Sequence, residues 1–145
     1  MERDAYRLAL RTIAIALGCA VLLAACGAFA VKSVRGEFGE RAIAQRWCDA
    51  HGGVTEFRFA DGTRADCLTA EYVIEFDWAH KWAEAFGQAA HYQGWTCETP
   101  AVGCRRAAAV LILKKPSDVR YAERLRDAAR RAGVDLTVWT VEADK

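Results

Sequence analysis

Apolar residues recur along the chain at two spacings, which separate predicted helices from predicted strands. Steps of three and four residues predict helices over residues 37–50, 78–93 and 118–132. Alternation of apolar and polar residues predicts strands over residues 54–59 and 134–141. The uninterrupted apolar run at residues 107–113 predicts a strand that is buried on both faces.

Turn residues complete this outline. Asp61-Gly62 is a two-residue hairpin signal, so the chain should return as a second strand over residues 63–68. Residues 71–77 are rich in Tyr, Val, Ile and Phe and predict a third strand. Ser117 is expected to cap the last helix and Gly133 to end it. The resulting order, αβββαβαβ, predicts an α/β domain with a mixed central sheet, because helices separate the later strands.

The start of the chain has a different pattern. Residues 12–31 form a stretch of 20 residues without a charge, preceded by a short segment that contains arginines. Such a run is typical of an export signal or a membrane anchor. Cys26 follows Leu-Ala-Ala and resembles the lipidated cysteine of a bacterial lipoprotein, while residues 28–30, Ala-Phe-Ala, fit ordinary signal cleavage. Uncut, the stretch is long enough to span a bilayer, so lipoprotein, anchor and cleaved signal all remain open.

These fates divide the chain into a signal or anchor at residues 1–31, a polar linker at residues 32–40 and an α/β domain at residues 41–145. Each of them places the domain outside the cytoplasm, in the cell envelope or periplasm. The lipoprotein and the uncut anchor would also hold it at the membrane. Thiols oxidise outside the cytoplasm. The expected disulfides join Cys48 to Cys67 and Cys97 to Cys104. A zinc site from Cys48, His51 and Cys67 is the competing interpretation, but a fourth ligand at suitable spacing is not evident.

Composition and charge narrow the function classes. After residue 31 the chain has 17 basic and 17 acidic residues, so overall basicity gives no argument for nucleic-acid binding. The charge is nevertheless uneven, with −4 over residues 32–104 and +6 over residues 105–131, whose arginines could dock phosphates or anionic lipid. Serine occurs only at positions 33 and 117, which argues against a serine hydrolase. The glycine-rich loops of dinucleotide-binding and phosphate-binding proteins are missing.

Three carboxylates are the strongest chemical signal. Glu75 and Asp77 must point the same way on the third strand, and hairpin pairing could bring Asp66 alongside them. Carboxylates that lie close together repel one another and favour a cation, so the three predict a Mg²⁺ or Mn²⁺ site. The following helix carries a polar edge that could border the same cleft: Lys81, Glu84, Gln88 and Tyr92. His80 and His91 are interpreted as helix-surface residues.

With these residues in place, the sequence resembles the PD-(D/E)xK, or restriction-endonuclease-like, nucleases and in particular their RecB-like branch. The resemblance covers most of residues 37–141, since the αβββαβ order matches the core of that family. It implies that Asp66 is the second-strand aspartate, that Glu75 is the first acid of the E-x-K element and that Gln88 and Tyr92 belong to the Q-x-x-x-Y motif. The chain also looks like small exported bacterial proteins of unknown role that carry Trp-Cys, His-Gly-Gly, Asp-Cys-Leu-Thr and Lys-Trp-Ala-Glu-Ala. That second resemblance implies no activity.

The sequence departs from the family pattern at two positions. Ala65 replaces the proline of the motif, and Asp77 stands where the lysine of E-x-K belongs. Lys81, one helical turn further along, is expected to supply the missing ammonium group. The resulting prediction is an exported, membrane-tethered domain that acts as a Mg²⁺-dependent phosphodiesterase on nucleic acid, with Asp66, Glu75 and Asp77 as metal ligands. A non-catalytic envelope or interaction domain on the same scaffold is the alternative, in which Glu75 and Asp77 merely pair with neighbouring bases.

Overall fold

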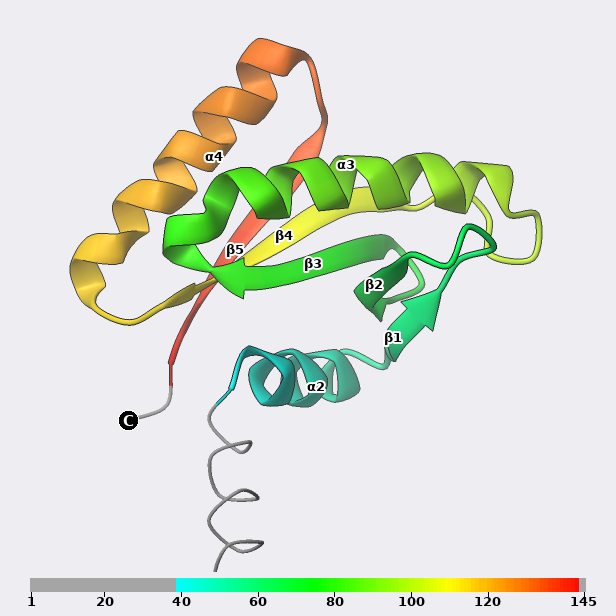
Figure 1. Cartoon of the computed structure of the whole chain (residues 1–145), viewed down its shortest axis with the longest axis horizontal. Helices are drawn as coiled ribbons and strands as arrows, with labels where there is room; N and C mark the ends of the chain where they lie inside the picture. Colours follow the sequence, from blue (N-terminus) through cyan, green and yellow to red (C-terminus); the bar gives the residue numbers. More distant parts are fainter. Residues whose placement is uncertain (1–38, 144–145) are drawn as a thin grey trace, which may run out of the picture. The chain divides into compact units, whose positions relative to one another are not determined.

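The computed structural model describes residues 39–143. They form an α/β domain with a five-stranded mixed sheet and three helices (Figure 1). The strands are β1 (Val54–Arg58), β2 (Arg64–Leu68), β3 (Tyr72–Trp78), β4 (Arg106–Leu113) and β5 (Leu136–Glu142). The helices are α2 (Glu40–Ala50), α3 (Trp82–Glu98) and α4 (Val119–Ala132), with short 3-10 turns at Ala79–Lys81 and Pro116–Asp118.

The strands lie in the sheet in the order in which they occur in the sequence. β1, β2 and β3 are antiparallel neighbours, whereas β3, β4 and β5 are parallel neighbours. The two parallel connections are made by α3 and α4, which both lie on one face of the sheet, while α2 lies on the other (Figure 1). This is the mixed sheet that the predicted order αβββαβαβ requires.

The core is divided between the two faces of the sheet. On the α2 face, Cys48 and Ala44 pack against alternate strand residues such as Ile74 and Phe76. On the other face, Ala85, Ala122 and Leu125 from the two crossover helices pack against Ala109, Leu111 and Val138. Because side chains alternate along β3, Val73, Glu75 and Asp77 point to the α3 face. The predicted common orientation of Glu75 and Asp77 follows from this arrangement.

Helix α3 begins and ends later along the chain than the periodicity predicts. A 3-10 turn precedes it, and the helix continues to Glu98, although the sequence predicts its end at Gln93 and a loop from Gly94. An isolated glycine costs a helix about 1 kcal/mol, which the packing of this helix on the sheet offsets. The helix ends before Pro100, and Thr99 is already extended. Cys97 therefore lies on the last turn of α3 and not in a loop.

The expected serine cap is wrong. Ser117 lies inside the 3-10 turn Pro116–Asp118, and α4 begins at Val119 without a side-chain cap. The carboxylate of Asp118 instead accepts a hydrogen bond from the backbone N–H of Lys114 and so closes the turn after β4. The prediction for the other end is confirmed, because Gly133 adopts the left-handed conformation (φ 69°) that ends α4.

Both predicted disulfides are present, Cys48–Cys67 and Cys97–Cys104. They are consistent with an oxidising, extracytoplasmic location. With Cys48 and Cys67 joined, neither thiolate is left for the zinc site considered above. The uncharged stretch at residues 12–31 and Cys26 lie outside the described residues. Within residues 39–143, no helix has the length and apolar character needed to cross a bilayer.

Candidate active site

β2 and β3 pair over two positions and then separate. Their register joins Cys67 to Ile74 and Leu68 to Val73. Next to this paired stretch, the backbone N–H of Phe76 on β3 donates a hydrogen bond to Asp66 Oδ2 on β2 at 2.9 Å. The carboxylate of Asp66 thus takes the place that a backbone carbonyl of β2 would occupy in a continuous ladder. We call the opening between the two strands the fork, and Asp66 lies at its apex.

Glu75 lies beside the fork and is almost completely buried, with 6% of its surface exposed. Its Oε2 atom has no hydrogen-bond partner. Burial and, after it, the negative charges of Asp66, Asp77 and Glu40 together raise the pKa of Glu75 to about 9, with Arg64 acting in the opposite direction. Glu75 therefore carries a proton at neutral pH unless a cation neutralises its surroundings.

Asp77 ends the acidic face of β3 and is 3% exposed. Its Oδ1 accepts the backbone N–H of Trp78 at 2.8 Å and lies 3.4 Å from Lys81 Nζ. Lys81 also lies 3.6 Å from Glu84 Oε2. The charge of Asp77 is the main reason why the pKa of Lys81 is raised above its usual value. Lys81 is therefore a permanent cation beside the fork, and its exposed side chain can reach a ligand.

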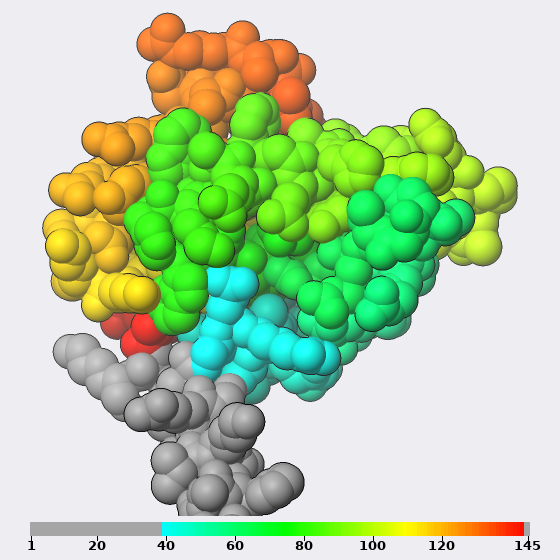
Figure 2. Space-filling model, viewed as in Figure 1, coloured from blue at the N-terminus to red at the C-terminus, as the bar shows by residue number. Residues whose placement is uncertain are grey.

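Sequence reasoning missed Glu40, the first residue of α2. Burial, the charge of Asp77 and a hydrogen bond to its carboxylate together raise the pKa of Glu40 to about 7, with Lys81 acting in the opposite direction. In Figure 2 the cyan segment that contains α2 lies directly against the green segment that contains the end of β3 and the start of α3. Helical periodicity marks the buried face of α2, but it says nothing about which strand end the first residue will meet. Tertiary packing alone brings Glu40 to Asp77.

The predicted pair on α3 lies close to the acids. Tyr92 Oη donates a hydrogen bond to Gln88 Oε1 at 3.1 Å, and the ring of Tyr92 stacks on Phe59 at 5.7 Å between centroids. Burial raises the pKa of Tyr92 to about 12, and the charges of Glu75 and Asp66 contribute to the same shift. Tyr92 is therefore a protonated hydrogen-bond donor over the whole physiological range. Asp66, Glu75, Asp77 and Lys81 thus influence one another electrostatically, Tyr92 is influenced by Glu75 and Asp66, and Gln88 is connected to them through its hydrogen bond with Tyr92.

Glu56, on the strand beyond Asp66, adds a further charge. It has a left-handed backbone (φ 57°) and forms ion pairs with Arg64 and, at 3.4 Å, with Arg41. These two cations therefore pair with Glu56, whereas Asp77 pairs with Lys81. Burial raises the pKa of Asp66, although the hydrogen bond from Phe76 lowers it and the charge of Glu56 raises it again. The interpretation that nearby bases simply neutralise the strand acids holds for Asp77 but leaves Glu75 without a cation.

The oxygen-only donor set suits a hard divalent cation. The buried, unpartnered Oε2 of Glu75 and the raised pKa values of three acids are the strain that such a cation would relieve. Against this, residues 39–143 contain no three His, Cys, Asp or Glu side chains that are already grouped as metal ligands. The residues thus fit a metal by chemistry, and binding it would draw the carboxylates closer together.

The arginines of α4, which the sequence also offered as functional residues, make their contacts with other groups, and the two histidines of α3 and the turn before it lie at the surface. His80 is exposed, and His91 contacts Asp61 and Trp95 on the outer side of α3. Several arginines of α4 are engaged within the domain, since Arg130 and Arg131 pair with Asp127 and Arg126 donates to the carbonyl oxygen of Val138. Arg120 and Arg124 lie over the ring of Tyr121. These five arginines of α4 therefore contact neighbouring groups of α4 and β5.

Comparison of the chain with protein-family models, with curated proteins and with solved structures finds no match. The geometry of the fork and the chemistry of its side chains are therefore the grounds on which a function can be argued.

Proposed function

We propose that this chain is a divalent-metal-dependent phosphodiesterase that acts on nucleic acid outside the cytoplasm, on a restriction-endonuclease-like fold. The strand directions, antiparallel from β1 to β3 and parallel from β3 to β5, support the fold assignment. The resemblance of Asp66, Glu75, Gln88 and Tyr92 to the family motifs supports the same assignment.

One observation carries the proposal: a buried carboxylate oxygen of Glu75 without a partner, surrounded by three other acids at the point where two strands separate. Burying a carboxyl group without a compensating partner costs stability, and no contact offsets that cost at Oε2 of Glu75. Perturbed carboxyl groups are concentrated at functional sites. An acidic cluster that needs a cation is what metal-assisted hydrolysis requires.

In the proposed site, Asp66, Glu75 and Asp77 hold Mg²⁺ or Mn²⁺. The bound metal would lower the pKa of a coordinated water and offset the charge that develops on the phosphate oxygens. The chain itself must then position the phosphodiester and move one proton.

The side chains around the acids suit these tasks. Lys81 places a permanent positive charge next to Asp77 and can orient a phosphate oxygen. Glu40 has a pKa of about 7, so at neutral pH it can take a proton from an attacking water. The hydroxyl of Tyr92 and the amide of Gln88 form a hydrogen-bonded pair that can orient this water or the phosphate.

The non-catalytic alternative has one observation in its favour. The acids around the fork, within residues 39–143, are not already grouped as metal ligands, and Asp77 is paired with Lys81. A scaffold that has lost its chemistry would retain such residues without binding metal. Metal binding therefore decides between the two functions.

The test is a titration of the full chain, purified in detergent, with MnCl₂ and MgCl₂, read by thermal melting. We expect the melting temperature to rise with metal, because a ligand that binds only the folded state stabilises it. The rise should disappear in Glu75→Gln and Asp66→Asn and persist in Glu123→Gln, which changes an exposed acid on α4. Without metal, Glu75→Gln should melt higher than the wild type, since it removes a buried acid. No rise in the wild type, or an equal rise in all variants, would leave the scaffold alternative.

The second measurement is the cleavage of nucleic acid by the full chain. Labelled single-stranded DNA, duplex DNA and RNA are incubated with the full chain and Mn²⁺, and the products are separated by length. We expect cleavage that Lys81→Ala abolishes and Glu123→Gln leaves unchanged. Unchanged turnover in Lys81→Ala would refute the role of this ammonium group.

Tethering to the membrane through residues 12–31 is part of the proposal. The wild type and a Cys26→Ala variant are both grown with radioactive palmitate, and each full chain is then partitioned between a detergent phase and an aqueous phase. Together the two measurements distinguish lipidation from an uncut anchor. Label in the wild type that is lost in Cys26→Ala supports the lipoprotein. An unlabelled chain that still enters the detergent phase supports the anchor, and a shortened chain in the aqueous phase supports cleavage.

A further inference from the structure

A concavity lies on the α2 face of the sheet, and none of the fork residues lines it. It has a volume of about 470 Å³ and lies between the end of α2, the loop before β3 and the edge strand β5. Its main lining side chains are Trp47, His51, Glu71, Tyr72, Trp139 and Thr140. Trp47, Tyr72 and Trp139 are each partly exposed, so the aromatic surface is open to a ligand. We call this concavity the aromatic pocket.

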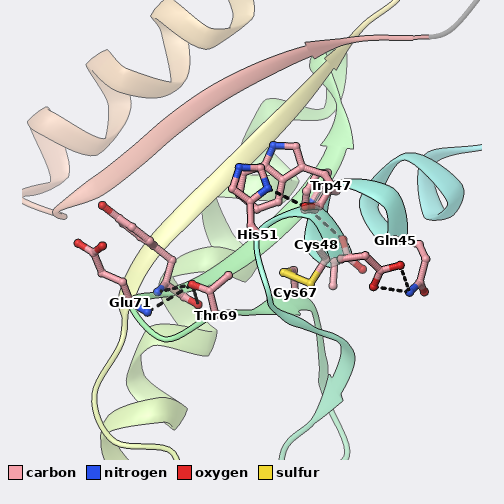
Figure 3. The surroundings of a disulfide bond; sticks show 11 residues. Gln45, Trp47, Cys48, His51, Cys67, Thr69 and Glu71 are labelled. Atoms are coloured by element: carbon pink, nitrogen blue, oxygen red, sulfur yellow. Dashed lines mark hydrogen bonds between the residues drawn. A yellow bond between two sulfur atoms is a disulfide. The ribbon is translucent and has the colours of Figure 1, made fainter.

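The rings of the pocket touch one another and form one wall. Trp139 lies 5.6 Å from Trp47 and 5.1 Å from Tyr72 between ring centroids. His51 stacks on Trp47 at 3.6 Å with an interplanar angle of 13°. The stacked pair of Trp47 and His51 is visible in Figure 3 at the end of α2, over the strands of the sheet. A flat, partly apolar ligand can lie on such a surface.

The wall is held in place before any ligand arrives. Trp47 directly precedes Cys48, whose disulfide to Cys67 ties the end of α2 to β2 (Figure 3). On the other side, Thr69 Oγ1 accepts the backbone N–H groups of Glu71 and Tyr72 at 3.3 and 2.9 Å and fixes the loop. A pre-formed pocket loses little conformational entropy when it binds.

The pocket combines acceptors with donors, since the indoles of its two tryptophans carry N–H groups and the hydroxyl of Thr140 can do both. His51 Nδ1 lies 2.7 Å from the carbonyl oxygen of Trp47, and a carbonyl can only accept, so Nδ1 carries the proton. In the neutral imidazole, Nε2 is then left with a lone pair. The carboxylate of Glu71, which is exposed and pairs with Arg106 at 3.3 Å, adds further acceptors. The pocket therefore suits a neutral ligand whose groups both donate and accept hydrogen bonds, as sugar hydroxyls do.

This arrangement argues against charged ligands. A quaternary ammonium ligand is bound by rings spaced around it as a cage, whereas these rings touch each other, and the guanidinium of Arg106 already lies 5.2 Å from the centre of the Tyr72 ring. A phosphate would need a cation, and the described residues that line the pocket include neither lysine nor arginine. Arg106, at its rim, is engaged by Glu71, Asp135 and the hydroxyl of Tyr72.

We propose that the aromatic pocket binds a neutral pyranose ring of a glycan. The apolar C–H face of the sugar would lie on Trp139 and its neighbours, while its hydroxyl groups donate hydrogen bonds to His51 Nε2 and to Glu71. A sugar is the neutral ligand class that combines a flat apolar face with a rim of donors and acceptors, as this pocket requires. The two disulfides are consistent with the extracytoplasmic space, where envelope glycans occur.

The full chain is kept in a detergent that has no sugar headgroup. Chitotriose and maltotriose are titrated into it, and binding is measured by isothermal calorimetry and by tryptophan fluorescence. Choline chloride and adenosine monophosphate are titrated as the charged alternatives. We expect saturable binding of at least one trisaccharide in the millimolar range or tighter, and none of the two charged probes. Saturable binding of choline or of the nucleotide instead, or no binding of either sugar at millimolar concentration, overturns the proposal.

Two variants locate the site. His51→Ala removes an exposed acceptor and should weaken sugar binding about tenfold without altering the fold. His80→Ala, an exposed histidine on the 3-10 turn after β3, is the matched control and should leave binding unchanged. Trp139→Ala should abolish binding, and its circular dichroism spectrum reports whether the sheet survives. Equal sugar binding in the wild type and in His51→Ala and folded Trp139→Ala would overturn the location. Glu75→Gln should bind the sugars normally, so the result does not depend on the proposed hydrolase.

Discussion

Asp66 accepts the backbone N–H of Phe76 at 2.9 Å, at the point where β2 and β3 stop pairing. A side chain thereby replaces one hydrogen bond of a sheet, and the two strands can diverge without leaving a buried N–H unsatisfied. Asp66 has two tasks in consequence. It holds the fork open as a structural acceptor, and it contributes one of the acids that surround Glu75.

The structural task can be measured by removing the acceptor. Asp66→Ala leaves the N–H of Phe76 unsatisfied in the interior, so the free energy of unfolding should fall by about 1–3 kcal/mol. Asp66→Asn keeps an oxygen in the same place and should lose much less. Urea unfolding of the two variants, followed by circular dichroism at pH 7, makes the comparison. Equal losses in the two variants would show that the hydrogen bond to Phe76 is not what holds the fork.

Glu75 predicts a stability that falls as the pH rises. Its pKa of about 9 in the folded chain lies above the ordinary value near 4.5, so the folded state binds a proton more tightly than the unfolded state does. The stabilisation is complete below pH 4.5 and is lost progressively up to about pH 9, with a slope of up to about 1.4 kcal/mol per pH unit from this group. Glu75→Gln should flatten this part of the profile. Urea unfolding of both proteins at pH 5, 7 and 9 gives the slopes, and parallel profiles would contradict the assignment.

Glu40 predicts the pH dependence of the proposed reaction. With a pKa of about 7, Glu40 loses its proton near neutrality, and a general base works only in the deprotonated form. The rate of metal-dependent cleavage should therefore rise with pH through about pH 7. In Glu40→Gln the amide can still donate a hydrogen bond to Asp77, but it cannot take up a proton. A variant that keeps the wild-type rise in rate would assign the proton transfer to another group.

Local sequence patterns account for most of the fold but only part of the site. The alternation of residues 71–77 correctly places Glu75 and Asp77 on one face, and Asp61-Gly62 correctly places the hairpin that brings Asp66 near them. The two disulfides follow from four cysteines in an oxidising compartment. These features depend on neighbours in the sequence or on a small number of possible pairings.

The rest depends on how distant elements pack. Glu40 meets Asp77 because the first turn of α2 lies close to the end of β3, and no pattern within α2 encodes that meeting. The separation of β2 from β3 shortens a ladder that the hairpin pattern would extend. The aromatic pocket joins Trp47, Tyr72 and Trp139 from three elements. In the sequence around it, each of these three residues has the pattern of an ordinary half-buried aromatic side chain.

Gly53 has no room for a side chain. A Cβ atom at this position would lie 2.6 Å from the Sγ atoms of both Cys48 and Cys67. Gly53→Ala should therefore destabilise the domain by about 1–3 kcal/mol through overpacking. Gly52→Ala is the matched control, since nothing lies within 4 Å of its Cβ and its cost, about 1–2 kcal/mol, comes from the left-handed backbone (φ 66°).

A double-mutant cycle separates these two causes. In a Cys48→Ala/Cys67→Ala background the sulfur atoms are gone, so most of the cost of Gly53→Ala should vanish, whereas the cost of Gly52→Ala should stay the same. Urea unfolding of the wild type, of the background and of each glycine variant in both supplies the six free energies. An unchanged cost of Gly53→Ala in the background without these sulfurs would mean that the disulfide is not the obstacle.

The two disulfides should open in a fixed order when a reductant is added. Cys48 and Cys67 are completely buried, whereas Cys97 and Cys104 are exposed at the end of α3 and in the following loop. A thiolate must reach a sulfur atom to exchange with it, so mild dithiothreitol should reduce Cys97–Cys104 while Cys48–Cys67 persists. Alkylation followed by peptide mass spectrometry identifies the bridge that opens first. The loop lengths predict that losing the buried bridge costs about 3 kcal/mol and losing the exposed bridge about 2 kcal/mol.

The two disulfides should also differ in their effect on sugar binding in the aromatic pocket. Because the buried bridge Cys48–Cys67 anchors Trp47, its loss should weaken sugar binding, whereas loss of the exposed bridge Cys97–Cys104 should not. Sugar binding that survives in the Cys48→Ala/Cys67→Ala variant would show that packing alone holds the wall of the pocket.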